Sequence, residues 1–88
     1  MTKLDTLRLA IDQTDKELVR LLEERFKLVR EIGHYKKENN LPIFDPEREK
    51  QVLESKERLV SNKADWQYYE RIFKLFMDIS KEMEKWKN

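Results

Sequence analysis

The sequence predicts an all-α fold with three helices per chain, one long and two shorter, in an intertwined homodimeric helical bundle. Residues 4–37 contain no proline, and their apolar side chains recur at steps of three and four, the spacing of one amphipathic helix. Residues 39–46 then carry two asparagines and two prolines, which end that helix and begin another. The chain is 39% hydrophobic and 42% charged, a balance that suggests a core shared with a second chain.

The first helix is expected to begin near Thr2 or Leu4 and to end near Glu38. At 1.5 Å per residue it would be about 50 Å long, more than a compact chain of this size needs. Its overhanging half would expose leucine and isoleucine side chains over an area that a monomer rarely tolerates. Antiparallel pairing with the same helix of a second chain would cover them, so we expect a dimer with one core. Gly33 is expected to permit close helix packing.

The two shorter helices have recognisable start signals. Asp45 suits an N-cap with Pro46 at the first helical position, and this second helix is expected to end near Val60. Residues 61–63 are expected to form a turn, with Asp65 as the N-cap of the third helix. The apolar face of the third helix is expected to consist of Trp66, Tyr69, Ile72, Phe73, Phe76, Ile79, Met83 and Trp86.

Composition argues against several functional classes. The net charge is only +1 with acids and bases interleaved, whereas a nucleic-acid binder usually carries a stripe of one sign. No apolar run approaches the roughly 20 residues that cross a membrane, and the N-terminus lacks the apolar core of a signal peptide. Without cysteine and with one histidine, His34, a metal site is not expected. We therefore expect one cytoplasmic domain over residues 1–88.

Polar residues interrupt the apolar faces of all three expected helices. Arg25 and Lys36 are eleven residues apart, about three turns, and lie on nearly the same line of the first helix. Glu49 shares the inner face of the second helix with its apolar residues, and Ser80 and Glu84 are one turn apart on the third. Together they predict a pocket whose natural ligand is a small dianion with a polar handle, such as a dicarboxylate.

Two further arginines extend this set. Arg48 stands beside Glu49 on the second helix. Arg8 lies roughly 25 Å before Arg25 along the first helix, too far away to join the pocket of its own chain. In an antiparallel dimer, Arg8 of the partner subunit would complete the cluster.

Each of these residues also has a simpler interpretation. An arginine on an apolar stripe is more often a snorkelling or interface residue than a ligand-binding one. Lys36 lies beside Lys37 and suits a solvated surface, and Glu84 lies in a charged stretch typical of a frayed helix end. Periodicity alone leaves both interpretations open.

Six short segments run through the three expected helices in a fixed order. They are Leu7-Arg8-x-x-Ile11-Asp12, Leu21-Leu22-x-Glu24-Arg25, Ile32-Gly33-x-x-Lys36, Pro42-Ile43-x-Asp45-Pro46-Glu47-Arg48-Glu49, Arg71-Ile72-Phe73 and Asp78-Ile79-Ser80. In residue type, order and spacing they resemble the AroQ-type (all-helical) chorismate mutases over essentially the whole chain.

The resemblance implies an intertwined dimer with two equivalent sites that convert chorismate to prephenate. It implies catalytic roles for Lys36, Glu84 and Arg25, with Lys36 donating to the ether oxygen of the substrate. The implied substrate-binding residues are Arg8 of the partner subunit and Arg25 for the two carboxylates, Asp45 and Glu49 for the ring hydroxyl, and Arg48 and Ser80 for the carboxylate end. The rearrangement is unimolecular, so no metal or cofactor is expected.

Glu84 departs from the commonest family pattern, in which a glutamine is the second donor to the ether oxygen. A carboxylate cannot donate a hydrogen bond, whereas a carboxylic acid can. Burial and Glu49 favour the acid while Lys36 and the arginines favour the carboxylate, and the sequence leaves this contest open. Some relatives carry glutamate here. We expect activity that falls as the pH rises.

Two alternative functions remain at this point. Isochorismate-pyruvate lyases share the expected fold and ligand shape, but the inward Glu49 favours the mutase. A non-catalytic helical dimerisation module would explain the long helix, but it would not explain why Arg25, Lys36 and Glu49 all face inward.

Overall fold

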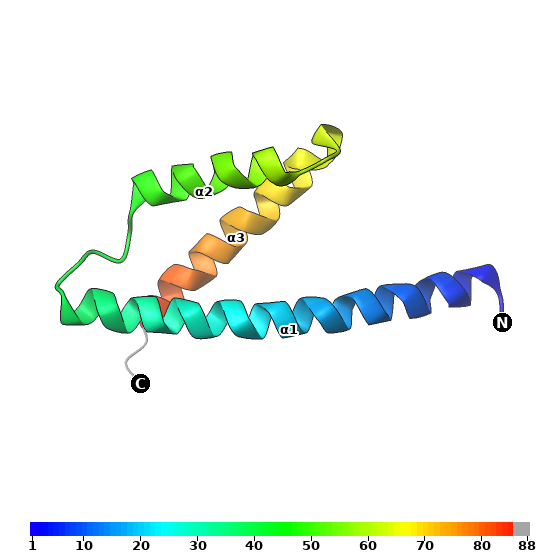
Figure 1. Cartoon of the computed structure of the whole chain (residues 1–88), viewed down its shortest axis with the longest axis horizontal. Coiled ribbons are helices and arrows are strands. Elements are labelled where there is room, and N and C mark those ends of the chain that lie inside the picture. Colours follow the sequence, from blue (N-terminus) through cyan, green and yellow to red (C-terminus); the bar gives the residue numbers. More distant parts are fainter. Residues whose placement is uncertain (86–88) are drawn as a thin grey trace.

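The computed structural model describes residues 1–85 and confirms the all-α prediction (Figure 1). Helix α1 covers Lys3–Glu38, α2 covers Pro46–Leu59, and α3 covers Trp66–Lys85, with one 3-10 turn, η1, at Lys63–Asp65. This part of the chain contains no strand. Trp86, expected on the apolar face of the third helix, lies outside the described residues.

Helix α1 has satisfied caps at both ends. The Thr2 hydroxyl accepts from the backbone N–H of Asp5 at 3.1 Å, and the Asp5 carboxylate accepts from the N–H of Thr2 at 3.2 Å, which completes a capping box. At the other end Asn40 takes a positive φ of 55°, and the N–H of Leu41 donates to the carbonyl of Lys36 at 2.8 Å. These caps fix the ends of a helix that runs along the longest dimension of the molecule, 56 Å (Figure 1).

Side-chain caps also set where the chain turns back. The Asp45 carboxylate accepts from the N–H of Arg48 at 3.1 Å, as expected for the N-cap of α2. The prediction that Asp65 caps the third helix is wrong, because Asp65 is the last residue of η1. The Asn62 side chain accepts from the N–H of Ala64 at 3.1 Å and so starts helical structure three residues earlier.

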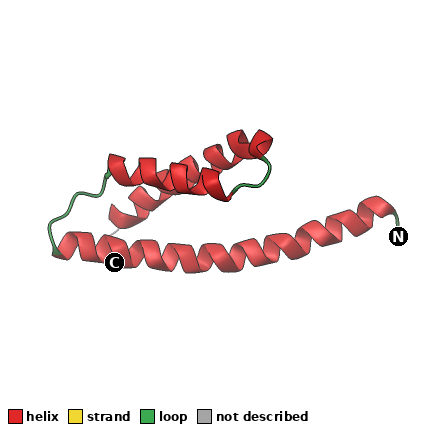
Figure 2. Cartoon of the chain, turned by 45° about the horizontal axis from the view of Figure 1, so that its top comes forward, coloured by secondary structure: helices red, strands yellow, loops and turns green. Residues whose placement is uncertain are grey.

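Helix α3 packs against both other helices and thereby joins α2 to α1. Figure 2 shows α2 and α3 together beside the C-terminal half of α1, while the N-terminal half of α1 extends away from them. The buried side chains come from all three helices and from the residue that follows α2: Val29, Val52, Met77, Ser80 and Val60.

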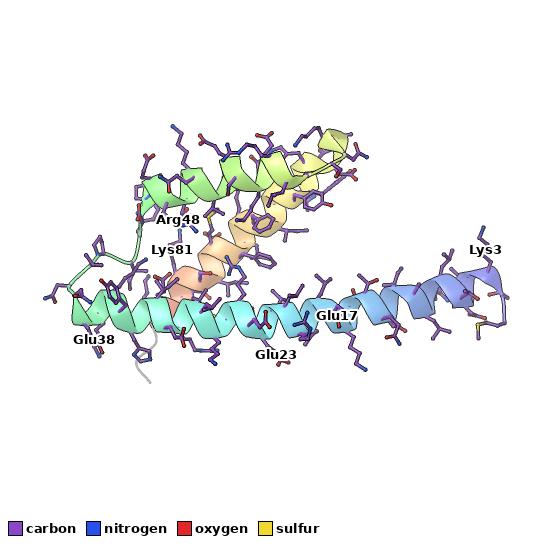
Figure 3. The ribbon with its side chains drawn as sticks, in the orientation of Figure 1. Lys3, Glu17, Glu23, Glu38, Arg48 and Lys81 are labelled. Carbon is purple, nitrogen blue, oxygen red and sulfur yellow. The ribbon has the colours of Figure 1, made fainter. Side chains whose placement is uncertain are left out.

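The N-terminal half of α1 keeps its apolar stripe uncovered in the single chain (Figure 3). Leu4, Leu7, Ile11 and Leu18 have relative exposures of 54%, 52%, 59% and 50%. Contiguous apolar surface of this kind marks an interaction site. The N-terminal half of α1 therefore extends beyond the other two helices, as expected from the sequence.

Gly33 lies where the backbones of α1 and α3 come into direct contact. A Cβ at this position would lie 2.8 Å from the Cα of Glu84 and 3.0 Å from its carbonyl oxygen. Both are backbone atoms that cannot rotate away, so the observed helix spacing requires glycine. The prediction that Gly33 permits close helix packing is confirmed.

Gly33→Ala should lower the stability of the fold, even though alanine favours helix formation by about 1 kcal/mol. The added methyl group forces α3 away from α1, an overpacking that costs about 1–3 kcal/mol. The midpoint of thermal unfolding, followed by circular dichroism, should fall by several degrees. His34→Ala, at the exposed neighbouring residue, is the matched control and should leave it unchanged. A midpoint for Gly33→Ala at or above that of the wild type would contradict this account.

Candidate active site

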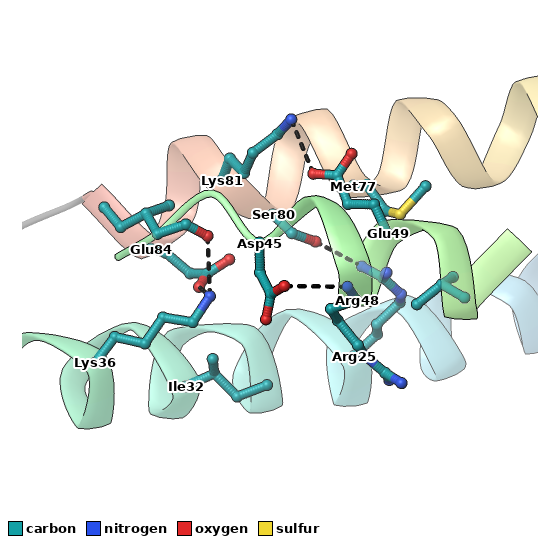
Figure 4. A pocket seen from close by; sticks show the side chains of 12 residues that line it. Arg25, Ile32, Lys36, Asp45, Arg48, Glu49, Met77, Ser80, Lys81 and Glu84 are labelled. Atoms are coloured by element: carbon teal, nitrogen blue, oxygen red, sulfur yellow. Dashed lines mark hydrogen bonds and ion pairs between the residues drawn. The ribbon is translucent and has the colours of Figure 1, made fainter. Parts of the chain in front are cut away.

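A cavity of about 250 Å³ lies between the C-terminal half of α1, the start of α2 and the end of α3 (Figure 4). Its wall combines charged and apolar side chains from all three helices and the connection before α2: Arg25, Ile32, Lys36, Ile43, Asp45, Arg48, Glu49, Val52, Met77, Ser80, Lys81 and Glu84. The wall contains seven of the eight site residues expected from the sequence, all except Arg8.

Arg25 reaches the cavity from the middle of α1. Its Nη1 donates to the Ser80 hydroxyl at 2.9 Å, and that hydroxyl donates to the carbonyl of Phe76 at 2.7 Å. The guanidinium carbon also lies 4.9 Å from the centre of the Phe76 ring. Burial lowers the pKa of Arg25, because desolvation disfavours the charged form, yet an arginine remains cationic at neutral pH. Within residues 1–85 Arg25 forms no ion pair, so its charge is available to an anionic ligand.

Lys36 and Glu84 meet across the interface of α1 and α3. The Lys36 Nζ lies 2.6 Å from Oε1 of Glu84 and donates to the carbonyl of Ile43 at 3.0 Å. The Glu84 side chain is only 8% exposed, and its Oε1 has no well-aligned hydrogen bond among the described residues. The pair is thus a close ion contact of poor alignment, and both groups retain capacity for a ligand atom.

Glu49 on α2 is paired with Lys81 on α3, whose Nζ lies 3.0 Å from Oε2 of Glu49. Lys81 is not among the site residues expected from the sequence. Its spacing was the available signal, because Lys81 lies four residues after the buried Met77 and three before Glu84, on the same face of α3.

Asp45 and Arg48 line the cavity at the start of α2 (Figure 4). One oxygen of Asp45 is occupied by the N-cap bond to the backbone of Arg48. The second oxygen remains for a ligand, since an ionised carboxylate accepts at both oxygens. The guanidinium of Arg48 has no ion-pair partner in the described part of the chain.

Arg8 is exposed on the N-terminal half of α1, and the single chain does not bring it to the cavity. It precedes Arg25 by seventeen residues, which is roughly 25 Å along the helix axis. The separation expected from the sequence is therefore present.

The charged side chains of the wall favour an anion. Four cations and three carboxylates line the cavity, which leaves a formal charge of +1: Arg25, Lys36, Arg48 and Lys81 against Asp45, Glu49 and Glu84. Two of the cations, Lys36 and Lys81, are already paired with carboxylates. The two arginines are thus the free cations of the described wall, and their planar donors suit carboxylate groups.

Comparison with known proteins identifies one family. The family model described as chorismate mutase type II matches residues 7–85. A protein of Methanocaldococcus jannaschii named chorismate mutase is 30% identical over 84 residues, which cover 94% of this chain and 85% of that protein. A solved structure, described as a conserved hypothetical protein from Pyrococcus furiosus, superposes with a TM-score of 0.79 at 33% identity and covers 97% of this chain and 99% of the other.

Several relatives are much longer proteins. The bifunctional chorismate mutase/prephenate dehydratase of Aquifex aeolicus is 49% identical over 59 residues, 67% of this chain and 16% of that protein. Across three such curated relatives the chain spans only 16–17% of their length. None of the helices in residues 1–85 is long and apolar enough to cross a membrane.

Proposed function

The chain belongs to the chorismate mutase type II family, and from this membership we propose that it catalyses the rearrangement of chorismate to prephenate. The observation that carries the proposal is the cavity in which Arg25 and Arg48 keep free guanidinium groups beside the Lys36–Glu84 pair. Chorismate offers two carboxylates, an ether oxygen and a ring hydroxyl, and each has a complementary group in this wall.

The reaction needs positioning rather than a nucleophile. In the [3,3] rearrangement the C–O bond of the enolpyruvyl ether breaks while a new C–C bond forms to the ring, and no atom leaves or enters. The arginines hold the two carboxylates, which fixes the flexible enolpyruvyl arm over the ring in the reactive conformer. Ser80 supports this clamp, because its hydroxyl accepts from Arg25 and fixes the guanidinium orientation. The proposed reaction involves no metal or cofactor.

Negative charge grows on the ether oxygen as the C–O bond breaks, and donors placed there stabilise the transition state. Lys36 is the first proposed donor, because its ammonium group is held at the cavity wall by Ile43 and Glu84. Glu84 is the second proposed contact to this oxygen, where only a carboxylic acid, and not a carboxylate, can donate. On the opposite wall, Glu49 and the free oxygen of Asp45 are proposed to accept the ring hydroxyl.

The proposed site is completed by a second copy of the chain. The uncovered apolar stripe on the N-terminal half of α1 suits an antiparallel partner, since the half that carries Arg8 would then lie beside the half that carries Arg25. Arg8 of the partner subunit would add a third carboxylate-binding cation. The homodimer, the single domain over residues 1–88 and the cytoplasmic location stay predictions.

Neither alternative is favoured over the mutase. The family model and the relatives cited here carry the name chorismate mutase, and none of these is named an isochorismate-pyruvate lyase. A pure dimerisation module gives no reason for the buried Lys36–Glu84 pair, which costs desolvation without an evident gain in stability.

Arg25→Ala should abolish most of the activity without unfolding the protein. The test follows the loss of chorismate by ultraviolet absorbance and identifies prephenate as the product. Loss of this clamp and of its electrostatic stabilisation should lower kcat/KM about 10²–10³-fold. Arg20→Ala is the matched control, because Arg20 is an exposed arginine of the same helix whose ion pairs within residues 1–85 are with Glu17 and Glu24. If the folded wild-type protein does not accelerate the loss of chorismate above the uncatalysed rate, the proposed function is refuted. Isochorismate would then be the next substrate to test.

Glu84→Ala should lower kcat/KM about 10²–10³-fold in the same assay, because it removes a proposed donor to the ether oxygen. Glu84→Gln should retain activity, since an amide nitrogen donates a hydrogen bond from the same place. A Glu84→Ala variant as active as the wild type, or a Glu84→Gln variant as inactive as Glu84→Ala, would contradict this role.

A further inference from the structure

Lys81 joins three separate parts of the cavity wall. Its Nζ lies 3.0 Å from Oε2 of Glu49 on α2 and 4.8 Å from the centre of the Phe44 ring in the connection between α1 and α2. It also lies 3.5 Å from Oδ1 of Asp78, one turn earlier on its own helix. Figure 4 shows the Lys81 side chain above the cavity, pointing across to Glu49.

Lys81 contacts two carboxylates, and the contact with Glu49 is the closer of the two. Asp78 is the local partner, at the i,i+3 spacing usual on a helix surface, and its side chain is 71% exposed. Glu49 belongs to another helix and is 28% exposed, yet it is the closer partner. Hydrogen bonding to Glu49 raises the pKa of Lys81, so the ammonium group is charged throughout the neutral range. Lys81 thus brings its positive charge to a carboxylate of the substrate wall as well as to one on the adjacent surface.

The positive charge of Lys81 favours binding of a dianionic ligand in the cavity. An unpaired Glu49 would face the substrate as a free carboxylate, and like charges in a partly desolvated cavity repel. With Lys81 the described wall has a formal charge of +1, and without it the charge would be zero. Lys81 also restricts the rotamers of Glu49, which leaves the other carboxylate oxygen to accept a hydroxyl.

We infer that Lys81 is a positioning residue of this site: it holds the Glu49 carboxylate at the wall for the substrate hydroxyl and offsets its charge against the dianion. The inference rests on the proposed function. Because the hydroxyl and the total charge of the substrate are the same in the ground state and in the transition state, the effect should fall on binding more than on turnover.

The test compares chorismate kinetics of Lys81→Met with those of the wild type. Methionine keeps the apolar stem against Phe44 but removes the charge, so KM should rise about fivefold with kcat within about twofold. Lys81→Arg, which keeps the charge and the pairing, should restore KM. Lys74→Met is the matched control, since Lys74 pairs with Glu70 on the same helix outside the cavity, and it should leave KM unchanged.

A double-mutant cycle with Glu49→Gln then shows whether Lys81 acts through Glu49. In that background Lys81→Met should change KM by less than about twofold, because the carboxylate to be positioned is gone. An equal rise in both backgrounds, or a fall in kcat that matches the fall in kcat/KM, would overturn the inference. Lys81→Gln replaces Lys81→Met if circular dichroism shows that the methionine variant does not fold.

Failure of this inference differs from failure of the proposed function. If the wild type is active and Lys81→Met leaves KM unchanged, only the proposed role of Lys81 is rejected. A folded wild type that is inactive on chorismate rejects the proposed function, and the inference falls with it.

Discussion

The direct contact between α1 and α3 at Gly33 is the constraint on which the rest of the structure depends. It sets the distance between the two helices at the level of Glu84, whose backbone Gly33 meets. Lys36 lies one turn further along α1, so the same helix spacing brings its ammonium group to the Glu84 carboxylate. A side chain at position 33 would separate the two groups that the proposed chemistry needs within reach of one oxygen atom.

The second constraint is the length of α1. A helix of 36 residues gives its C-terminal half to the cavity, and no other element within residues 1–85 covers its N-terminal half. Two arginines of the cavity have no ion-pair partner in that range, and Arg8 is not in the wall. In the proposed dimer the length of α1 would link assembly to function, because the same pairing that would cover the apolar stripe would also deliver the third arginine.

Much of this architecture could be predicted from the sequence, because it rests on helical periodicity and capping chemistry. The eleven-residue spacing of Arg25 and Lys36 and the inward position of Glu49 indicated a common pocket, and the family resemblance was needed to favour it over a solvated surface. All three residues line one cavity. Local side-chain competition was harder to foresee. The Asn62 side chain accepts from the N–H of Ala64, so helical structure begins before Asp65. Asn and Asp are both common N-cap residues, and the sequence alone did not distinguish them.

Lys81 was not anticipated for a related reason. A lysine in a charged helix end is usually solvated, and only the three-dimensional approach of α2 gives it Glu49 as a partner in addition to Asp78. Periodicity places a residue on a face, but it does not show which carboxylate of another helix an ammonium group will contact. Likewise, the sequence placed Glu84 near Lys36 without revealing that the two groups are in contact.

The central claim is that each site is built from two copies of the chain, and mixed dimers test it most directly. Arg8→Ala and Arg25→Ala should each be nearly inactive as pure proteins. When the two are unfolded together and refolded at equal concentration, half of the dimers should be mixed, and each mixed dimer should carry one fully intact site. The account predicts recovery of about one quarter of the wild-type activity. A mixture no more active than its components would contradict a shared site.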